Sequence, residues 1–275
     1  RWLFEKNKIN MKNILVSIGV PVFNGEKFIG KTLDSLINQT YKNIEIIISD
    51  NCSNDKTAKI CKNYCKLDSR IKFFRHDKKI DPAKNFYFVL KKSKGDFFTW
   101  NAVNDFKSQN FIEVNLAFLL ANKHYAASTS KNFFGSKKIC NNFGLEGELE
   151  QRINIFFDNC WASQGIFYGL IKKSILKKCS YLGELFFACD WAINIFILKN
   201  GPIKRLNNGS IMIDDKGMSN TYELKEIFVN SFLDRIFPFR KLLFYTLICI
   251  SKCSFSFKIK IVKKIIYLNF ILAKH

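Results

Sequence analysis

The chain has 275 residues, of which 48% are hydrophobic, enough for one large domain or for a domain with an appendage. Its 44 lysines and arginines against 23 aspartates and glutamates give a formal net charge of +21, which favours a phosphorylated substrate, a nucleic acid or an acidic membrane as partner. Only three histidines accompany nine cysteines without a Cys-x-x-Cys pair, which argues against a zinc site and a Ser/His/Asp nucleophile. Metal chemistry would therefore rely on carboxylates and a hard cation.

Two apolar runs near the beginning of the chain enclose a segment of helical period. Residues 14–22 lead into a Pro-Val-Phe-Asn-Gly turn, and residues 44–49 form the second run. Such runs indicate parallel strands that are buried on both faces and joined by a helix, so we expect no signal peptide in the first run. Ligands of open α/β sheets bind beyond the carboxyl ends of the strands. The sequence places four polar residues there, which predicts a nucleotide site: Asn24, Glu26, Asp50 and Asn51.

Strand and helix signals continue to alternate, which predicts a parallel, doubly wound sheet. Residues 125–147 carry a weaker, loop-rich pattern that supports no assignment. The predicted elements are a helix over 56–66 capped by Asp55, a strand over 71–75, a helix from Pro82 stopped by Gly95, a strand over 96–101, a helix over 109–122 and a long apolar helix from Asp190 to Gly201.

The C-terminal segment differs in character from the rest of the chain. Residues 223–275 are rich in Phe, Ile and Leu and interspersed with lysine and arginine, so we divide the chain into a domain over 11–222 and a basic, apolar, helical extension. The longest uncharged stretch, residues 242–251, is too short to span a bilayer. Two alternatives remain open: an amphipathic segment lying at a membrane surface, or a pair of helices packed on the domain with lysines outward.

The chain resembles a family 2 glycosyltransferase with the GT-A fold. The resemblance covers residues 16 to about 220 and depends on the opening VSIGVPVFNGEKFIGKTLDSLINQTYKNIEIIISDN, followed in the family's order by DPAKNF, WNAVNDF, QGIFYG and CDW. It implies an α/β fold with a mostly parallel, doubly wound sheet flanked by helices. It also implies a site for a nucleoside diphosphate sugar at the end of the first strand.

In that family the first strand end holds the base and ribose of the donor, with a UDP-sugar favoured here. The resemblance implies Pro21 and Phe23 as backbone and stacking contacts, and Asp50 as the carboxylate that accepts from the base N–H. Asn24 joins this donor site. Glu26, expected in the first turn of the next helix, either binds the donor or suits the helix dipole. Lys84 matches a basic position that meets a phosphate, and the alternative is a solvated lysine.

The family's fourth strand ends in an Asp-x-Asp turn that coordinates Mg²⁺ or Mn²⁺ between the donor phosphates. Here the turn is Ala-Val-Asn-Asp, so the expected metal ligand is Asp105 or, in the other register, the neutral Asn104, which would hold a cation more weakly. A late His or Arg of the family is missing from IMIDDKGMSN. Asp214 or Asp215 is the candidate substitute.

The catalytic base of inverting members precedes the last long helix and matches Asp190, whose alternative role is to cap that helix. Trp161 and Trp191 are expected to stack on sugar rings or to pack in the core. Gln164 and Gly165 are candidates for the acceptor pocket.

The resulting hypothesis is an inverting, cytoplasmic glycosyltransferase that makes a surface polysaccharide or lipid-linked glycan. Its acceptor is a glycan or lipid-linked hydroxyl, and residues 223–275 contact the inner face of the membrane. The alternative is a nucleotide-sugar-binding protein of the same fold with lost catalysis. No nucleic-acid motif accompanies the positive charge, so nucleic acid is not expected as a partner.

Overall fold

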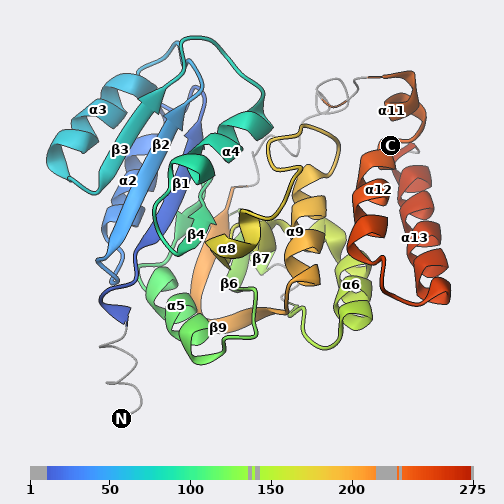
Figure 1. Cartoon of the computed structure of the whole chain (residues 1–275). Helices are drawn as coiled ribbons and strands as arrows, with labels where there is room; N and C mark the ends of the chain where they lie inside the picture. The colour runs from blue at the N-terminus through green and yellow to red at the C-terminus, as the bar shows by residue number, and fades with distance from the viewer. Residues whose placement is uncertain (1–10, 136–137, 140–142, 215–227, 229–230, 274–275) are drawn as a thin grey trace.

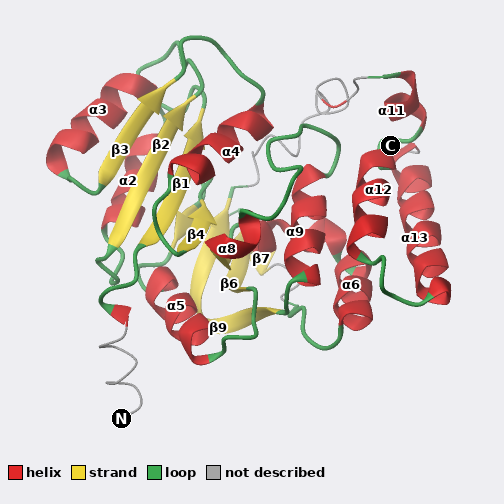
Figure 2. Ribbon diagram, in the orientation of Figure 1, coloured by secondary structure: helices red, strands yellow, loops and turns green. Residues whose placement is uncertain are grey.

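The computed structural model describes residues 11–135, 138–139, 143–214, 228 and 231–273. These residues form a central sheet with helices on both faces (Figure 1, Figure 2). The strand order is β3-β2-β1-β4-β8-β6-β9-β5, with β7 paired to β6. The strands are β1 Val16–Val22, β2 Ile44–Asp50, β3 Ile71–Arg75, β4 Phe97–Trp100, β5 Phe106–Lys107, β6 Ala127–Phe134, β7 Lys138–Ile139, β8 Leu170–Lys172 and β9 Ile203–Ile213.

The helices largely follow the apolar periodicity of the sequence. None of those described is both long and apolar enough to cross a bilayer. They are α2 Ile29–Ile37, α3 Thr57–Leu67, α4 Pro82–Lys92, α5 Phe111–Ala121, α6 Leu149–Asp158, α7 Gln164–Phe167, α8 Lys173–Leu176, α9 Cys189–Lys199, α11 Phe232–Ile236, α12 Arg240–Cys249 and α13 Phe255–Ala273, with a 3₁₀ turn, η1, at Cys160–Ala162.

The first four strands of the chain, β1 to β4, pair in parallel with one another, as the sequence predicts. β1 pairs in parallel with β2 and β4, and β2 pairs in parallel with β3. Every residue of β1 and β2 is buried, because helices cover both faces. Gly19 lets β1 approach α4, since a Cβ there would lie 2.6 Å from Phe98 and Val89. The expected α/β sheet with flanking helices is confirmed.

Two long strands, β6 and β9, fall where the sequence supports no strand assignment. They pair in parallel with each other, while β8 joins β6 to β4 through antiparallel pairs. β6 escapes the apolar pattern because its buried residues are mostly polar. The loop-rich interpretation of residues 125–147 is therefore wrong over most of β6, which crosses the middle of the sheet.

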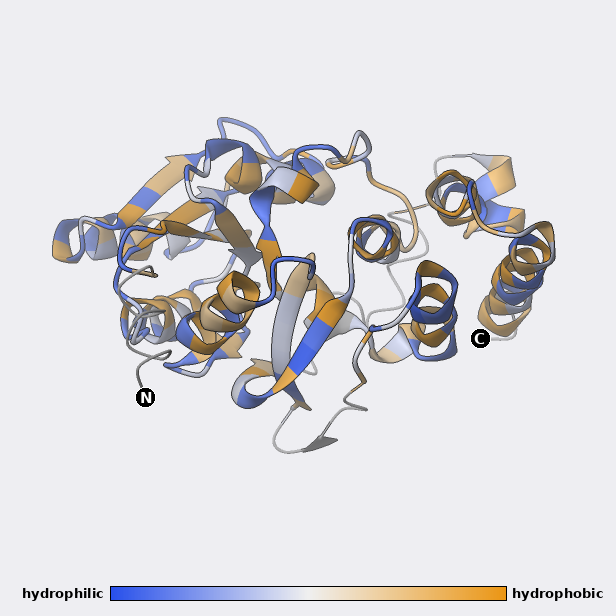
Figure 3. Cartoon of the chain, turned by 60° about the horizontal axis from the view of Figure 1, so that its bottom comes forward, coloured by the Kyte–Doolittle hydropathy of each residue, from blue (hydrophilic) through white to orange (hydrophobic). Residues whose placement is uncertain are grey.

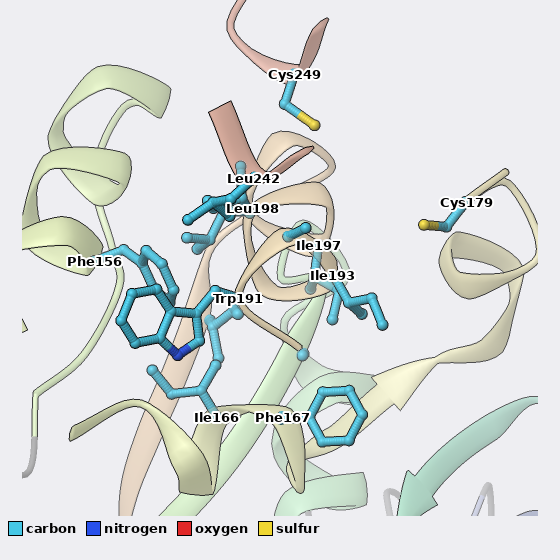
Figure 4. Close-up of a cluster of buried hydrophobic side chains, with 14 of the residues drawn as sticks. Phe156, Ile166, Phe167, Cys179, Trp191, Ile193, Ile197, Leu198, Leu242 and Cys249 are labelled. Atoms are coloured by element: carbon cyan, nitrogen blue, oxygen red, sulfur yellow. The ribbon is translucent and has the colours of Figure 1, made fainter. Parts of the chain in front are cut away.

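The C-terminal helices pack on the rest of the molecule through one apolar face. α12 lies against α9, and α13 lies against α6 (Figure 1). Apolar and polar residues alternate around these helices (Figure 3). The core that begins beneath the sheet continues through Trp191 and Leu198 of α9 to Leu242 and Cys249 of α12 (Figure 4). The division of the chain at residue 222 falls outside the described residues and stays a prediction.

Candidate active site

Asp50 lies at the carboxyl end of β2, where the sequence places the nucleotide site. Its carboxylate is fully buried and accepts three hydrogen bonds. One oxygen accepts from the backbone amide of Ser53 at 3.0 Å and from the Ser53 hydroxyl, and the other accepts from Arg75 at 3.1 Å. The Arg75 side chain, 40% exposed, covers the carboxylate. The Arg75 guanidinium therefore occupies one hydrogen-bonding position of the Asp50 carboxylate.

The turn after β1 is fastened to the loop after β2 by paired hydrogen bonds. The Asn24 amide donates to the Ser53 hydroxyl at 2.9 Å, and the Asn24 side chain accepts from the Asn54 amide at 3.0 Å. The Glu26 carboxylate accepts from the Lys56 amide at 2.9 Å. Glu26 precedes α2 and is not in its first turn, so the dipole argument for it is wrong. Asn24 and Glu26 both stabilise the loop next to Asp50.

Side chains from three elements meet at the same edge. Phe23 is partly exposed, and the ammonium of Lys79 lies 4.2 Å from the centre of its ring. Pro21 lies beyond the β1–β4 ladder, which ends at Gly19, so its missing N–H costs no ladder bond. Arg75 and Lys79 were missed by the sequence argument, although Arg75 ends a predicted strand at this edge.

The amino end of α4 is tied to the same edge. Asn51 exchanges two hydrogen bonds of 2.8 Å with the backbone of Ile80, and Asn85 accepts from the Ser49 hydroxyl at 2.6 Å. Asp81 accepts from the Ala83 amide, which caps the helix start. Lys84 follows in the first turn of α4 and is exposed to solvent.

The turn after β4 brings two distant acidic residues together. The Asp214 amide donates to one Asp105 oxygen at 3.2 Å, and the Asn104 amide nitrogen donates to the Asp214 carboxylate at 3.0 Å. The other Asp105 oxygen is buried and has no hydrogen-bond partner. Val103 packs against Gly25 and Val22 at the end of β1. Asp215 lies outside the described residues.

These oxygens fit a hard cation. Mg²⁺ is commonly held by one or two carboxylates together with substrate phosphates. Asp105 and Asp214 supply two carboxylates. The buried Asp105 oxygen that lacks a hydrogen-bond partner is the atom that a cation would satisfy. Within the described ranges, no cluster of three or more His, Cys, Asp or Glu residues is placed to hold a metal without substrate.

A buried lysine and a tyrosine lie beside Asp105. Lys107 donates to the carbonyl oxygen of Trp100 at 3.0 Å and to the Asn101 side chain at 3.1 Å. Burial lowers the pKa of Lys107 and raises that of Asp105, and the attraction between the two charges opposes both shifts. The Tyr168 ring lies 5.8 Å from the Lys107 ammonium.

Asp190 occupies the first turn of α9, as predicted, and is partly exposed. Burial raises its pKa to about 6, although the backbone amides of Trp191 and Asp190 oppose the rise. The preceding Ala188 has a φ of 62°, a conformation rarely adopted by alanine. The N-cap residue of α9 is Ala188, whose side chain cannot accept a hydrogen bond, and the first-turn amides of Asp190 and Trp191 bond the Asp190 carboxyl, as in the capping alternative.

The pKa of the buried Tyr168 responds to both carboxylates of the site. Burial raises the pKa of Tyr168 well above its usual value, and the negative charges of Asp105 and Asp190 raise it further. Both carboxylates therefore lie within electrostatic range of one protonated phenol. The Tyr168 backbone oxygen accepts from Thr99 of β4 at 2.9 Å, which fixes this residue against the sheet. Its signal in the sequence was the QGIFYG segment.

Two tryptophans and a glycine near Asp190 have different roles. Trp191 is buried and stacks on Phe239, so it belongs to the core. Trp161 is 50% exposed and meets the edge of Trp191 at 5.0 Å. Gly165 is buried, and a Cβ there would collide with the Asn132 side chain, so only glycine fits at this position, and its place in an acceptor pocket stays a prediction.

Known proteins resemble this chain over part of its length. Residues 17–162 match the sequence profile of glycosyl transferase family 2. An uncharacterized glycosyltransferase of Haemophilus influenzae is 36% identical over 108 residues, 39% of this chain and 43% of that protein. The GalNAc(5)-diNAcBac-PP-undecaprenol beta-1,3-glucosyltransferase of Campylobacter jejuni is 30% identical over 185 residues, 62% of this chain and 56% of that protein. The chain thus spans only about half the length of these two relatives.

Solved structures share the architecture at low sequence identity. TarS of S. aureus, residues 1–349 with UDP-GlcNAc, has a TM-score of 0.62 at 20% identity and covers 78% of this chain and 64% of that one. The mannosyltransferase PcManGT of Pyrobaculum calidifontis, solved with GDP-Man and Mn²⁺, has a TM-score of 0.55 at 13% identity and covers 82% and 69%. These likenesses confirm the fold expected from the sequence.

Proposed function

The chain belongs to glycosyltransferase family 2, and we propose that it transfers a sugar from a nucleoside diphosphate donor to an acceptor hydroxyl with inversion at the anomeric carbon. The observation that carries this proposal is the position of Asp190. Its carboxyl is partly exposed, has a pKa raised to about 6 and shares Tyr168 with Asp105. A base with a pKa near the working pH is well suited to proton transfer.

The proposed reaction is a displacement in which Asp190 acts on the acceptor while the donor loses its nucleoside diphosphate. Asp190 accepts the proton of the acceptor hydroxyl while the acceptor oxygen forms a bond to the anomeric carbon. The bond from that carbon to the nucleoside diphosphate breaks on the opposite face. Tyr168 remains protonated and can donate a hydrogen bond to a carboxylate or a sugar oxygen.

Donor binding is assigned to the edge formed by β1, β2 and α4. Phe23 and the Pro21 backbone contact the base and ribose, Asp50 accepts from the base, and Lys84 meets a phosphate. Asn24 and Glu26 hold the surrounding loop. We favour a UDP-sugar because TarS was solved with UDP and with UDP-GlcNAc.

Asp105 and Asp214 would hold Mg²⁺ or Mn²⁺, with the carbonyl oxygen of Asn104 as a weaker ligand. When bound, the cation offsets the negative charge that develops on the leaving diphosphate. A second candidate function is nucleotide-sugar binding without turnover. It is favoured by the buried position of Asp105 and by the Lys107 charge beside it.

The acceptor is inferred to be a glycan or a lipid-linked sugar, in the synthesis of a surface polysaccharide or lipid-linked glycan. The named Campylobacter jejuni relative carries an undecaprenol-linked substrate in its name. Such acceptors lie at a membrane, so we infer a cytoplasmic protein in peripheral contact with the membrane through residues 223–275. The eight described cysteines are free, as in a reducing compartment.

One titration tests the catalytic proposal against the binding-only alternative. UDP is titrated calorimetrically with and without Mn²⁺, and donor hydrolysis is then measured. The enzyme proposal expects tighter UDP binding with Mn²⁺ together with hydrolysis. Binding without metal enhancement and without hydrolysis would favour the binding protein. A thermal-shift screen of UDP, TDP, GDP and CDP sugars identifies the base, because a ligand bound only to the folded state stabilises it.

A further inference from the structure

Helix α13 carries a second apolar stripe opposite the one that packs on the protein. Four residues spaced by one helical turn each face the core: Phe257, Ile261, Ile265 and Leu268. Another four, at spacings of four, seven and four residues, are exposed: Phe255, Ile259, Ile266 and Phe270. Both spacings keep their members on one side of a helix. Core packing therefore accounts for only one of the two stripes.

The exposed stripe is large for a surface that faces water. Phe255 is 78% exposed and Phe270 is 63% exposed. The Phe239 amide before α12 bonds Asn269 of α13 at 3.4 Å, and α11, which precedes α12, carries further exposed apolar side chains at this end of the two helices (Figure 1). Those side chains are Phe232, Leu233 and Ile236. Apolar side chains gathered in this way mark an interaction surface more often than single ones do.

The charged residues on α13 itself have one sign, although Glu150 and Asp158 of α6 contact Ser254 and Lys264. Between residues 231 and 273 there are eight lysines and arginines and one acidic residue, Asp234, which pairs with Arg240 at 2.9 Å. α13 contains four lysines and no aspartate or glutamate. Lys264 bonds the Asp158 and Asn154 side chains of α6. Lys260 and Lys263 are exposed, and no ion pair involves them in the described part of the chain.

Lys263 lies directly beside the apolar stripe. It follows Ile259 by four residues and precedes Ile266 by three, so the three side chains are neighbours on the helix surface. A lysine in this position can place its ammonium among lipid phosphates while its methylene groups stay with the apolar side chains. Two copies of this face would instead bring lysines of like charge together across a symmetric contact.

We propose that the stripe formed by Phe255, Ile259, Ile266 and Phe270 docks this protein on an anionic phospholipid surface. α13 then lies parallel to the membrane plane, with the apolar side chains at the level of the headgroups and acyl boundary and with Lys260 and Lys263 at the phosphates. The opposite stripe stays in the core, so docking requires no change in the fold. This surface gives the peripheral contact of the proposed function a defined face.

Vesicle co-sedimentation of the full chain tests the surface. We expect binding to phosphatidylcholine vesicles that contain phosphatidylglycerol, little binding to phosphatidylcholine alone, and loss of binding as salt rises. The double variant Phe255→Ser, Phe270→Ser should weaken vesicle binding by about tenfold. The double variant Lys260→Gln, Lys263→Gln should weaken vesicle binding to a similar extent. All four side chains are exposed, so folding should be retained.

Matched controls come from α3, which lies at the far side of the molecule from α13 (Figure 1). Leu67 is 80% exposed, and Lys62 and Lys66 are exposed beside it. Leu67→Ser, and Lys62→Gln with Lys66→Gln, should leave vesicle binding unchanged. A loss equal to that of the α13 variants would mean that general charge or hydrophobicity, and not this stripe, causes binding.

Three results would overturn the proposal. Equal binding to both kinds of vesicle would show that anionic lipid is not required. Unchanged binding by the α13 variants would show that the stripe is not the docking surface. A dimer seen by light scattering that Phe255→Ser with Phe270→Ser dissociates would make the stripe a contact between copies. The thermal shift by UDP is measured on the same samples. A normal shift without vesicle binding removes the membrane surface alone and leaves the proposed function standing.

Discussion

The donor half of the molecule and the half that carries the proposed base are built by different means. β1 to β4 and their helices follow one another along the chain, and most of the residues in these strands are apolar. The other half depends on β6, a buried strand whose core-facing residues are polar: Ser128, Thr129, Ser130 and Asn132. Asn115 donates to the Ser130 hydroxyl at 2.8 Å, and Thr129 donates to the Gly165 carbonyl oxygen at 2.7 Å. Polar strands of this kind are stable only where distant residues satisfy them.

In the proposed function, the first half binds the donor and the second half carries out the sugar transfer. The donor edge is held by hydrogen bonds between its loops before any ligand arrives, which lowers the cost of ordering it on binding. Asp190 belongs to the other half, where it lies in the first turn of α9. Variants of the donor edge should therefore change donor affinity, and variants around Asp190 should change the rate of transfer.

The largest effect is expected at Asp190. Asp190→Asn removes the proton acceptor and should lower the rate of transfer by at least about 100-fold, while UDP affinity stays within a few-fold. Single-turnover kinetics and calorimetric titration measure the two quantities. Asp96→Asn, at the exposed amino end of β4, is the matched control and should leave the rate unchanged. A normal rate in Asp190→Asn would remove Asp190 from the mechanism.

Asp50→Ala should weaken donor binding by about 1 to 3 kcal/mol, because Ser53 and Arg75 lose their acceptor and the base loses its partner. The control is Asp68→Ala, which breaks another carboxylate pair with an arginine, Arg70, at the amino end of β3. Donor affinity measured calorimetrically should be normal in the control.

Arg75→Ala sharpens the role of Asp50. If a base contacts Asp50 directly, removal of the covering guanidinium should preserve donor affinity or increase it. A loss as large as that of Asp50→Ala would mean that Arg75 makes the contact and that Asp50 positions it.

The rate of transfer should fall on the acid side with an apparent pKa of about 6, because only the ionised Asp190 accepts a proton. At pH 5 the rate should be about one tenth of its plateau, as expected one unit below that pKa. The raised pKa of Asp190 makes folding stability change with pH in the opposite direction to the transfer rate. Ionising this recessed carboxyl costs free energy, so its contribution to stability is greatest below the unfolded pKa and is lost as the pH rises through 6.

Thermal unfolding of Asp190→Asn checks that sign. The variant cannot ionise, so it should be at least as stable as the wild type at pH 7.5, and the difference should shrink toward pH 4. In Asp190→Glu, the transfer rate should still fall on the acid side near pH 6, with a displaced apparent pKa. That result would agree with the assignment of Asp190 as the base. A pH-independent rate between 5 and 8 would contradict it.

The smallest effect is expected at Trp161. Trp161→Ala should raise the acceptor KM by about two- to tenfold if its exposed face stacks on an acceptor sugar, since aromatic contacts contribute about 0.5 to 1.5 kcal/mol. Trp161→Phe keeps an aromatic face and should recover most of the loss. The donor Kd should be the same in both variants. An unchanged acceptor KM would leave Trp161 with a packing role against Trp191.

The amino-acid sequence by itself determined the parallel strands, the helices between them and the strand ends at which Asp50 and Asp105 lie. These features follow from local apolar periodicity and from the rule that strand ends share an edge. The position of Asp190 at the start of a long helix was also predicted correctly.

Only the tertiary structure decided what those residues contact. Asp214 reaches Asp105 because β9 pairs with β6 and β5 across the sheet, and β6 itself is concealed by polar residues whose partners are distant in the chain. Arg75 bonds Asp50, and the charges of Asp105 and Asp190 both raise the pKa of Tyr168, through the same long-range packing. The local sequence pattern specifies helices and strands because their formation depends on residues that are neighbours along the chain. Hydrogen-bond partners and pKa shifts depend instead on residues that are neighbours in space.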